Sequence, residues 1–550
     1  MIRSLSEITQ PSFSTRADVC VIGAGMAGLY MARQLASYGL RTVLVESGSA
    51  RTGHSANDLN EISDEHGCYQ WPVTGRARGL GGSSSVWGGK MMPLSSSDMA
   101  ERPHIDAPAW PLSHEALLEG LTEIEALFKL DDGTYEEGAP PHFRTGVELP
   151  QGDPDFAVRW AKWTRFRRGN IWRILKDQLA NHPFAEIWTN ATVDDFSIDR
   201  WSQRLVSLHC RDDAGRTLDV QADHFALAAG TIESTRLLLM LDRCGDDRIF
   251  GSCDALGRYF QDHLDAHVGR LAVCDPDRFD RLLAPRYRRM QRRSPHIELT
   301  ERAQTDDGVA SAFVHMTVDL SQNETLGAVK RLTKRIEMND YEGLLGEFQR
   351  SRLAPGSLGR LVARRLYHHT LFMPGDVGFN LRICIEQAPR SENRILLADT
   401  KDRLGMPKVN LRWRPGDIDE RTFRSTVSRL SAYWHRQGLD RICAIDWLAC
   451  ALPGASIIEA AQDYAHPSGT ARMGTDVRHS VVGIDLDCHH VANLSVVSAA
   501  CFPSSGSANP SLTIMLLAWR AARAVSRRMG RWAGNAQTNP GMKIREAANA

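Results

Sequence analysis

The hydrophobic positions near the N-terminus follow a strand–helix–strand order. Residues 17–23 read Ala-Asp-Val-Cys-Val-Ile-Gly, an apolar run typical of a strand buried in a parallel sheet. A helical pattern continues to Tyr38, where Gly39 ends it. Residues 41–45 form the next apolar run, and Glu46 follows directly. This order predicts a βαβ unit in an α/β fold.

The region 265–455 has a different pattern, in which strand-like runs alternate with basic helical stretches. The strand-like runs are 310–318, 377–386 and 408–413, and the helical stretches are 330–350 and 355–368. This pattern predicts an α+β second lobe built on a mostly antiparallel sheet. Near the C-terminus, an apolar strand at 494–498 precedes an apolar helix that begins at Pro510.

The basic segment 151–185 contains Trp160, Trp163 and Trp172. Basic residues interleaved with aromatic ones are found at nucleic-acid interfaces. The chain as a whole, however, has 66 Lys plus Arg and 66 Asp plus Glu, so it has no global basic field. We therefore expect amphipathic surface helices in this segment and no nucleic-acid partner.

Length and composition are those of a globular protein with two or more lobes. The chain has 550 residues, 42% of them hydrophobic and 24% charged. Residues 1–16 lack the basic and apolar regions of a secretory signal. The longest apolar run, 512–518, is too short to cross a bilayer. We expect a soluble, cytoplasmic protein with no transmembrane segment.

No cysteine or histidine pattern indicates a metal site. The 11 cysteines are scattered and include no Cys-x-x-Cys pair. The pairs His368-His369 and His489-His490 have no third ligand at metal-binding spacing. We expect these to be surface histidines and predict no metal.

A glycine motif stands between the first strand and its helix. In Gly23-x-Gly25-x-x-Gly28, the first glycine would make the tight turn, the second would admit a pyrophosphate, and the third would let helix and strand pack closely. The helix N-terminus would face the phosphates, and Glu46 would bind the adenosine ribose. The motif predicts a dinucleotide site but does not distinguish FAD from NAD.

The run 76–89 contains too many glycines and serines for the interior of a helix or strand. A flexible linker is one interpretation. Leu80, Val86 and Trp87 within the run favour a buried, ordered loop. Backbone N–H groups of such a loop would point at a ligand.

Two C-terminal segments contain the candidate chemistry. His466 stands in the turn His-Pro-Ser-Gly-Thr, and Asn509 precedes Pro510 at the start of the last helix. Imidazole titrates near neutral pH, so His466 is a candidate general base; alternatively, it is a core histidine bonded to a carbonyl. Asn509 can donate to a substrate oxygen, or it can cap the helix. Our hypothesis is that both segments meet at a flavin.

These motifs together resemble one family. Their order along residues 17–528 is that of the glucose–methanol–choline (GMC) oxidoreductases. The segments that carry the resemblance are Gly23-x-Gly25-x-x-Gly28 with Glu46, the Arg78-Gly-Leu-Gly-Gly-Ser-Ser loop, 257–263, 386–394, 404–407, and the His466 and Asn509 segments. The sequences of the His466 and Asn509 segments are most similar to those of the bacterial sugar and polyol dehydrogenase branch. This branch includes fructose and gluconate dehydrogenases and enzymes acting on glycosides.

The resemblance implies FAD as cofactor and oxidation of an alcohol to a carbonyl by hydride transfer to flavin N5. His466 would be the base, and Asn509 would hold the substrate oxygen. The residues that would bind FAD are Gly23, Gly25, Gly28, Glu46, Gly81, Gly82, Ser83, Ser84, Trp87, Gly88, Val193, Ser498, Ala499, Asn509, Pro510 and Thr513.

The resemblance also implies how the chain divides into domains. Residues 1–265 would be the first part of a Rossmann-like FAD-binding domain, with flavin-covering loops around 75–185. Residues 266–455 would bind the substrate, 456–530 would complete the FAD-binding domain, and 531–550 would be a flexible tail.

The chain departs from the family pattern at two positions. Ser498 stands where Asp is usual, so that contact is neutral here. Val86 stands where the sugar oxidases with covalently attached flavin have His, so we predict non-covalent FAD.

The sequence leaves the substrate and the electron acceptor open. The substrate would be a sugar, glycoside or polyol-like alcohol, and the acceptor would be oxygen or a quinone or cytochrome. One alternative is a natural-product tailoring alcohol oxidase or dehydrogenase of the same family. Another, an NAD(P)H-using reductase or monooxygenase, is disfavoured because no second glycine motif follows a clear strand. A binding protein without chemistry is disfavoured by the intact His466 and Asn509 segments.

Overall fold

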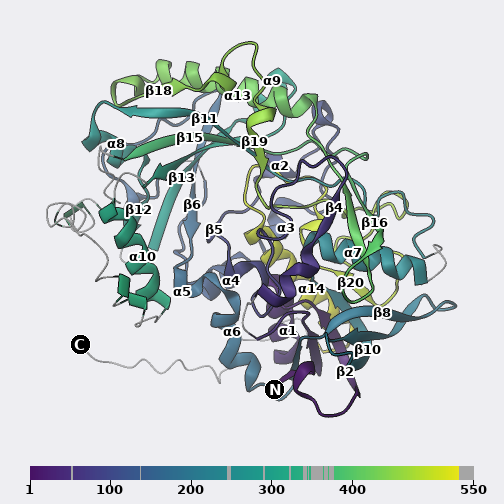
Figure 1. The fold of residues 1–550 in the computed structure, drawn as a ribbon. Helices are drawn as coiled ribbons and strands as arrows, with labels where there is room; N and C mark the ends of the chain where they lie inside the picture. Colours follow the sequence, from purple (N-terminus) through teal and green to yellow (C-terminus); the bar gives the residue numbers. More distant parts are fainter. Residues whose placement is uncertain are drawn as a thin grey trace.

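A computed structural model gives the fold of the chain as two lobes, each built around a large sheet (Figure 1). It describes residues 1–531 except 51–53, 137, 245–248, 289–290, 321–323, 339–342, 345, 348–358, 360–362, 365–368 and 371–376. The predicted tail lies outside the described residues, apart from Arg531. Within the described part of the chain, no helix has the length and apolar character needed to span a membrane.

The first sheet confirms the predicted βαβ unit and the α/β class. Its strands, in order of adjacency, are β1 (Ile2–Ser4), β7 (Ala185–Thr189), β3 (Thr42–Val45), β2 (Ser12–Ile22), β10 (Thr217–Leu227), β9 (Arg204–Arg211) and β8 (Thr192–Asp199), with β20 (Leu494–Val496) beside β10. From β1 to β10 the neighbours run parallel, and β9 and β8 are antiparallel additions.

One helix packs on this sheet and also contacts the last helix of the chain. α1 (Met26–Ser37) connects β2 to β3 and packs against α14 (Ser511–Arg528), the last helix. Val19, Val21 and Val43 are fully buried. This burial explains why the strands read as continuous apolar runs.

The second sheet is antiparallel throughout its main path, as predicted for this lobe. Its strands, in order of adjacency, are β18 (Cys443–Trp447), β11 (Leu264–Val273), β15 (Gly378–Ile385), β14 (Ala312–Asp319), β13 (Gln291–Leu299), β6 (Phe156–Trp163) and β5 (Lys90–Met91). α13 (Asp417–Arg436) packs on it through Phe423, Leu430 and Trp434. A small sheet of β16 (Arg394–Lys401), β17 (Pro407–Arg412) and β4 (Ile62–Asp64) lies beside α7 (Gly230–Cys244).

The three predicted strands of this lobe are confirmed as β14, β15 and β17. The predicted helix at 330–350 overlaps α10 (Glu324–Met338), which begins earlier. Most of 355–368 lies outside the described residues.

The prediction of surface helices over 151–185 is wrong for its first half. Residues Phe156–Trp163 form β6, and helices begin only with α5 (Phe166–Gly169) and α6 (Ile171–Ala180). Trp160 is 1% exposed and lies inside the second sheet.

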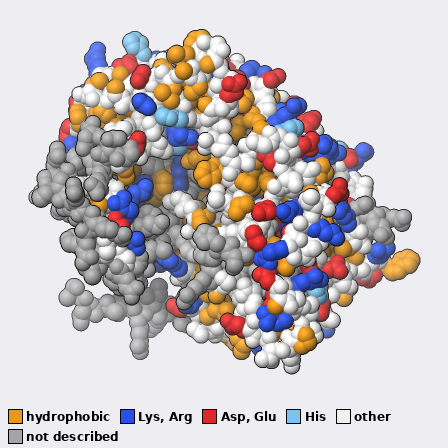
Figure 2. Space-filling view, in the orientation of Figure 1, with side chains coloured by type: hydrophobic (Ala, Val, Ile, Leu, Met, Phe, Trp, Pro, Cys, Tyr) orange, Lys and Arg blue, Asp and Glu red, His pale blue; other side chains and the backbone are white. Residues whose placement is uncertain are grey.

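The reason is that the basic residues of β6 are buried and paired. Arg159 binds Glu298 through two hydrogen bonds of 2.5 and 2.9 Å. Lys162 pairs with Glu125. These carboxylates come from distant segments, so the local pattern does not reveal them. On the surface, acidic and basic side chains are interspersed (Figure 2).

His490 departs from the prediction of surface histidines. It is buried, and its Nε2 lies 3.1 Å from the Val477 carbonyl oxygen, to which it can donate. His489 is half-buried beside the Gly474 carbonyl.

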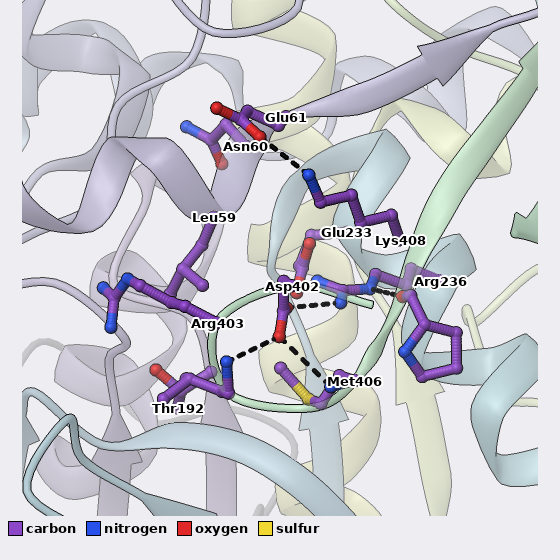
Figure 3. A network of polar contacts seen from close by, with 12 residues as sticks. Leu59, Asn60, Glu61, Thr192, Glu233, Arg236, Asp402, Arg403, Met406 and Lys408 are labelled. Atoms are coloured by element: carbon purple, nitrogen blue, oxygen red, sulfur yellow. Dashed lines mark hydrogen bonds and ion pairs between the residues drawn. The ribbon is translucent and has the colours of Figure 1, made fainter. Parts of the chain in front are cut away.

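A buried polar network holds the small sheet against α7 (Figure 3). Arg236 donates to Asp402 Oδ2 at 2.6 Å and to the Pro407 carbonyl at 2.7 Å. Glu233, one turn earlier on α7, pairs with Arg78 at 2.9 Å. Arg78 begins the glycine–serine loop, so the network connects that loop to the β16–β17 turn.

Candidate active site

A cavity of about 730 Å³ lies at the carboxyl ends of β2 and β3. Open parallel sheets bind their ligands at this edge. One part of the cavity is lined by Gly23, Glu46 and Val193, and another by His466 and Asn509. One continuous space therefore joins the dinucleotide motif to the two C-terminal segments.

The glycine motif forms the turn between β2 and α1. Gly23 has φ +99° and a Cβ on it would lie 2.8 Å from the Ala228 carbonyl oxygen. A Cβ on Gly28 would lie 1.9 Å from the Gly23 carbonyl oxygen, so only glycine permits this packing. On Gly25 a Cβ would come no nearer to the protein than 3.9 Å, and Gly25 lines the cavity. The protein itself therefore leaves room for a side chain at position 25, and such a side chain would project toward a ligand in the cavity.

Glu46 organises the backbone around this end of the cavity. Its Oε2 accepts a hydrogen bond from Ala24 N–H at 2.7 Å, and its Oε1 accepts from Gly48 and Gly79 N–H at 2.8 and 2.9 Å. The carboxylate thus joins three loops. Since each oxygen has two lone pairs, Oε2 retains one for a ribose hydroxyl.

These residues fit FAD. α1 begins after Gly25 with no side chain capping its N-terminus, so its first N–H groups are available to phosphate. The cavity volume falls within the range of about 300–1,000 Å³ that is usual for cofactor pockets. The Thr513 Oγ1 and Asn509 Oδ1 atoms are buried without a hydrogen-bond partner in the described part of the chain.

The glycine–serine loop is ordered rather than a linker. Residues Gly82–Ser85 form a short helical turn, and Ser84 Oγ donates to the Gly81 carbonyl at 2.5 Å. Trp87 Nε1 donates to the Gly169 carbonyl at 2.7 Å. Val86 is 58% exposed and lines the cavity.

Most residues predicted to bind FAD line the cavity. These are Gly23, Gly25, Glu46, Gly82, Ser83, Ser84, Trp87, Gly88, Val193, Ser498, Ala499, Asn509 and Pro510. Gly28, Gly81 and Thr513 do not line it. A Cβ on Gly81 would lie 2.1 Å from Asn170 Oδ1. Glycine at position 81 therefore allows the loop to pass close to Asn170.

Ser498 caps a turn of the protein itself. Its Oγ accepts from Ala500 N–H at 3.2 Å, at the start of the turn Ala499–Cys501. The Ser498 hydroxyl therefore has a hydrogen bond within its own turn.

His466 and Asn509 meet in the cavity. Asn509 Nδ2 lies 3.2 Å from His466 Nε2. The alternative in which Asn509 caps the last helix is wrong, because the cap position of α14 is Pro510 and no side chain caps it. The carboxamide of Asn509 is directed at the histidine instead.

A second histidine, which the sequence analysis did not single out, sets the proton on His466. His263 Nε2 lies 2.7 Å from the Gly506 carbonyl oxygen, and His263 Nδ1 lies 2.8 Å from His466 Nδ1. A carbonyl only accepts, so His263 must have its proton on Nε2 and accept at Nδ1. His466 therefore has its proton on Nδ1, and its Nε2 is a free base facing Asn509.

Burial keeps both rings neutral. It lowers the pKa of His466 well below the ordinary value, and the nearby His263 and Lys90 lower it further. Burial also lowers the pKa of His263. A neutral His466 can accept a proton at Nε2, whereas the imidazolium could not.

The backbone of His466 is fixed by Asp262. Asp262 Oδ1 accepts from His466 N–H at 2.8 Å, and Oδ2 accepts from the Tyr69 hydroxyl at 2.9 Å. Burial, together with Asp463, raises the pKa of the Asp262 carboxyl well above its usual range. Asp262 and His263 belong to the 257–263 motif, which the sequence analysis used only for the resemblance.

Two family models match the chain. One, described as GMC oxidoreductase, covers residues 389–518, and the other, described as FAD dependent oxidoreductase, covers residues 18–230.

Curated relatives match along most of their length. The chain is 23% identical to 6'''-hydroxyparomomycin C oxidase of Streptomyces lividus, over 92% of this chain and 91% of that protein. It is 24% identical to 2-methyl-1,2-propanediol dehydrogenase of Mycolicibacterium austroafricanum, over 93% of this chain and 96% of that protein. It is 26% identical to the fructose dehydrogenase large subunit of Gluconobacter japonicus, over 62% of this chain and 54% of that protein.

Solved structures share the fold. Pyridoxine 4-oxidase from Mesorbium loti superposes with a TM-score of 0.56 at 18% identity, covering 92% of this chain and 98% of that one. Formate oxidase superposes with a TM-score of 0.58 at 16% identity, covering 94% and 100%. The two family models and the curated relatives identify the chain as a FAD-dependent alcohol oxidoreductase of the GMC family.

Proposed function

We propose that this enzyme oxidises a CH–OH group of a sugar, glycoside or polyol-like alcohol to a carbonyl. The observation that supports this most directly is the free Nε2 of His466, held 3.2 Å from Asn509 Nδ2 inside the cavity of the dinucleotide motif. When bound, FAD supplies the acceptor for the hydride, at flavin N5. The protein must supply a proton acceptor and a hydrogen-bond donor for the alcohol oxygen.

His466 and Asn509 fill these two roles in the proposal. His466 Nε2 takes the hydroxyl proton as the hydride leaves the carbon, so two electrons and two hydrogens leave the alcohol together. Asn509 Nδ2 donates to the same oxygen and does not compete for its proton. The N-terminus of α14, which begins at the cavity with Ser511, favours negative charge there.

The roles in cofactor binding belong to the same proposal. Gly23, Gly25 and Glu46 hold the ADP half of FAD, with Gly28 shaping the turn. Val193 meets the adenine, and the loop from Gly81 to Gly88 passes the pyrophosphate and the flavin ring. Ser498, Ala499, Pro510 and Thr513 lie along the ribityl chain and the pyrimidine edge.

FAD is held without a covalent bond in this proposal, because Val86 cannot attach it. Denaturation should release all the flavin into the supernatant. Flavin that stays on the precipitated polypeptide would contradict this.

The electron acceptor is oxygen, a quinone or a cytochrome, and a cytoplasmic location remains a prediction. The relatives include proteins named as oxidases and as dehydrogenases. Anaerobic reduction of the bound flavin by a panel of sugars, glycosides and polyols, followed by reoxidation with air or a dye, separates these acceptors.

His466→Ala tests the central assignment. We expect the variant to retain FAD but to reduce it roughly 10²-fold more slowly, which is the scale for loss of a general base. Asn509→Ala should slow reduction less. Reduction of the His466→Ala variant at the wild-type rate would remove His466 from the mechanism.

A natural-product tailoring oxidase is the second candidate. It is favoured by the relatives named 6'''-hydroxyparomomycin C oxidase and paromamine 6'-oxidase. Reduction of the flavin by an aminoglycoside and by no simple sugar would support it. Rapid flavin bleaching by NADPH without any alcohol would instead favour the NAD(P)H-using class.

A further inference from the structure

Lys90 is a half-buried cation in the cavity that the proposed mechanism does not use. It begins β5, directly after the glycine–serine loop, and it lines the cavity. Its Nζ lies 2.9 Å from His296 Nδ1 and 4.4 Å from the centroid of the Phe313 ring. Among the described residues, no carboxylate forms an ion pair with it.

The neighbour of Lys90 does not neutralise it. Lys90 can only donate, so His296 Nδ1 accepts, and His296 Nε2 carries its proton toward Ser507 Oγ and Glu298 Oε2, each at 3.2 Å. Burial, and then the charge of Lys90, lowers the pKa of His296 to about 3, so the ring is neutral. Glu298 is already paired with Arg159. The cluster of Lys90, His296, Glu298 and Arg159 therefore has a net charge of about +1.

Lys90 lies at the same end of the cavity as the base. Its neighbour His296 has Nε2 3.2 Å from Ser507 Oγ, and the carbonyl of the adjacent Gly506 binds His263. Burial lowers the pKa of Lys90 itself to about 8, so the ammonium form still predominates at neutral pH.

The other charges at this end balance one another. Arg382 pairs with Asp265 at 2.5 Å, and His315 Nε2 lies 2.7 Å from the other Asp265 oxygen. Tyr464 connects this group to the base, since its ring centroid lies 5.9 Å from His315 and 5.0 Å from His466.

Asp463, next to Tyr464, is a further acid on the lining. Its Oδ1 accepts from Gln70 N–H at 2.6 Å, and burial raises its pKa, which favours the neutral form. Among the described residues, Lys90 has no carboxylate partner, whereas the Arg382 cation beside the base has Asp265.

We propose that the alcohol substrate of this enzyme carries a carboxylate and that Lys90 binds it. The proposal rests on the proposed function and narrows its substrate class to hydroxy acids, such as sugar acids. A half-buried ammonium without a counter-ion has lost part of its hydration, and a substrate anion would supply the missing charge. Two of its three N–H donors remain available after the bond to His296. A cationic aminoglycoside would instead meet a charge of its own sign.

The test compares matched alcohols that differ only in the acid group. The pairs are gluconate with glucitol, galactonate with galactitol, and a β-glucuronide with the corresponding β-glucoside. Anaerobic flavin reduction gives kcat/KM for each, and the flavin absorbance shift of the oxidised holoenzyme gives each Kd. We expect at least one acid to exceed its neutral partner by about 10- to 100-fold in kcat/KM, the scale of a hydrogen bond to a charged group.

Lys90→Gln should abolish that preference, so that the ratio of kcat/KM between each acid and its neutral partner falls to about one. Lys408→Gln is the matched control, because Lys408 pairs with Glu61 on the surface of the small sheet and should behave as wild type. FAD content is measured for all three proteins.

Three results would overturn the proposal. In the first, every neutral alcohol equals or exceeds its acid in the wild type. In the second, Lys90→Gln slows acids and neutral alcohols alike, which would place Lys90 on the reacting oxygen. In the third, acids bind the oxidised holoenzyme no more tightly than neutral alcohols. If no alcohol reduces the flavin but acids still bind through Lys90, the proposed function fails and the anion site stands.

Discussion

At the scale of single residues, the site depends on where one proton resides. The Gly506 carbonyl accepts a hydrogen bond from His263 Nε2–H, so His263 Nδ1 is an acceptor. His466 therefore has its proton on Nδ1 and donates it to His263 Nδ1. This order leaves a lone pair on the nitrogen that faces Asn509. His263 thus acts through His466 as a positioning residue.

His263→Leu removes the acceptor for the His466 Nδ1 proton, so the other tautomer becomes accessible. We expect flavin reduction to slow by about 10- to 100-fold, as for loss of a residue that orients a histidine. His263→Gln, which keeps an acceptor oxygen, should recover most of the rate. FAD content should match the wild type in both, and equal rates for the two variants would contradict the assignment.

The pH dependence of reduction follows from the lowered pKa of His466. Protonation of Nε2 removes the base, so the rate falls below that pKa and is constant above it. Because burial lowers the pKa well below the ordinary value of about 6.5, we expect no loss of rate as pH falls from 8 through 6.5. Stopped-flow reduction at saturating substrate measures this. A midpoint at or above 6.5 would show that the ring is not shielded as described.

The sequence predicted His466 and Asn509 but not the residues that prepare them. His263 is 203 positions from His466, and its role depends on a carbonyl, which no side-chain pattern encodes. Lys90 was missed because a single lysine after a glycine-rich loop has no distinctive sequence pattern. Only the folded structure shows that no carboxylate among the described residues pairs with it. The 257–263 motif, with its Asp-His pair, could have indicated His263.

At the scale of elements, the βαβ turn separates the needs of the fold from those of the ligand. Gly28 and Gly25 stand three residues apart at the start of the same helix. Only Gly28 is in a place where the protein leaves no room for a side chain.

Gly25→Ala and Gly28→Ala therefore form a matched pair. The Gly25→Ala apoprotein should melt at the wild-type temperature but bind FAD about tenfold or more weakly, because its methyl group projects into the cofactor space. Gly28→Ala should lower the melting temperature of the apoprotein itself. Circular dichroism melts and FAD titration measure the two effects, and an equal loss of stability in both variants would contradict the distinction.

The predictable elements were those whose hydrophobic pattern is local. The βαβ unit and the strands β14, β15 and β17 are of this kind. β6 was not, because the burial of Arg159 and Lys162 depends on Glu298 and Glu125 elsewhere in the chain. A buried ion pair has the same local pattern as a solvated basic face, so the sequence alone favoured the wrong secondary structure.

At the scale of the whole molecule, the small sheet is fastened to α7 by one buried charge pair. Arg236 is 2% exposed, and Asp402 binds it while also accepting from Leu404 and Met406 N–H at 2.9 and 3.1 Å. The pair thus orders a turn and holds it on the lobe that contains the dinucleotide motif (Figure 3).

Asp402→Asn removes the closer of the two carboxylates that pair with buried Arg236 and leaves Glu233 at 3.5 Å. We expect the free energy of unfolding to fall by about 3 kcal/mol, as for one-sided removal of a buried pair. Asp254→Asn is the control, since Asp254 pairs with Arg478 in an exposed position and its loss should cost about 0–1 kcal/mol. Denaturant titration of the two variants measures the difference. Equal values would mean that the buried pair is not needed for the small sheet.

The strand pairings of the second sheet have a practical consequence for anyone who wishes to express it alone. A fragment cut at the predicted boundary, 266–455, would begin inside β11 and would lack both β6 and β5. The edge of β13 that β6 normally covers would then offer a row of unpaired N–H and C=O groups to other molecules. Such a fragment should aggregate, and a version that includes residues 90–163 should be more soluble.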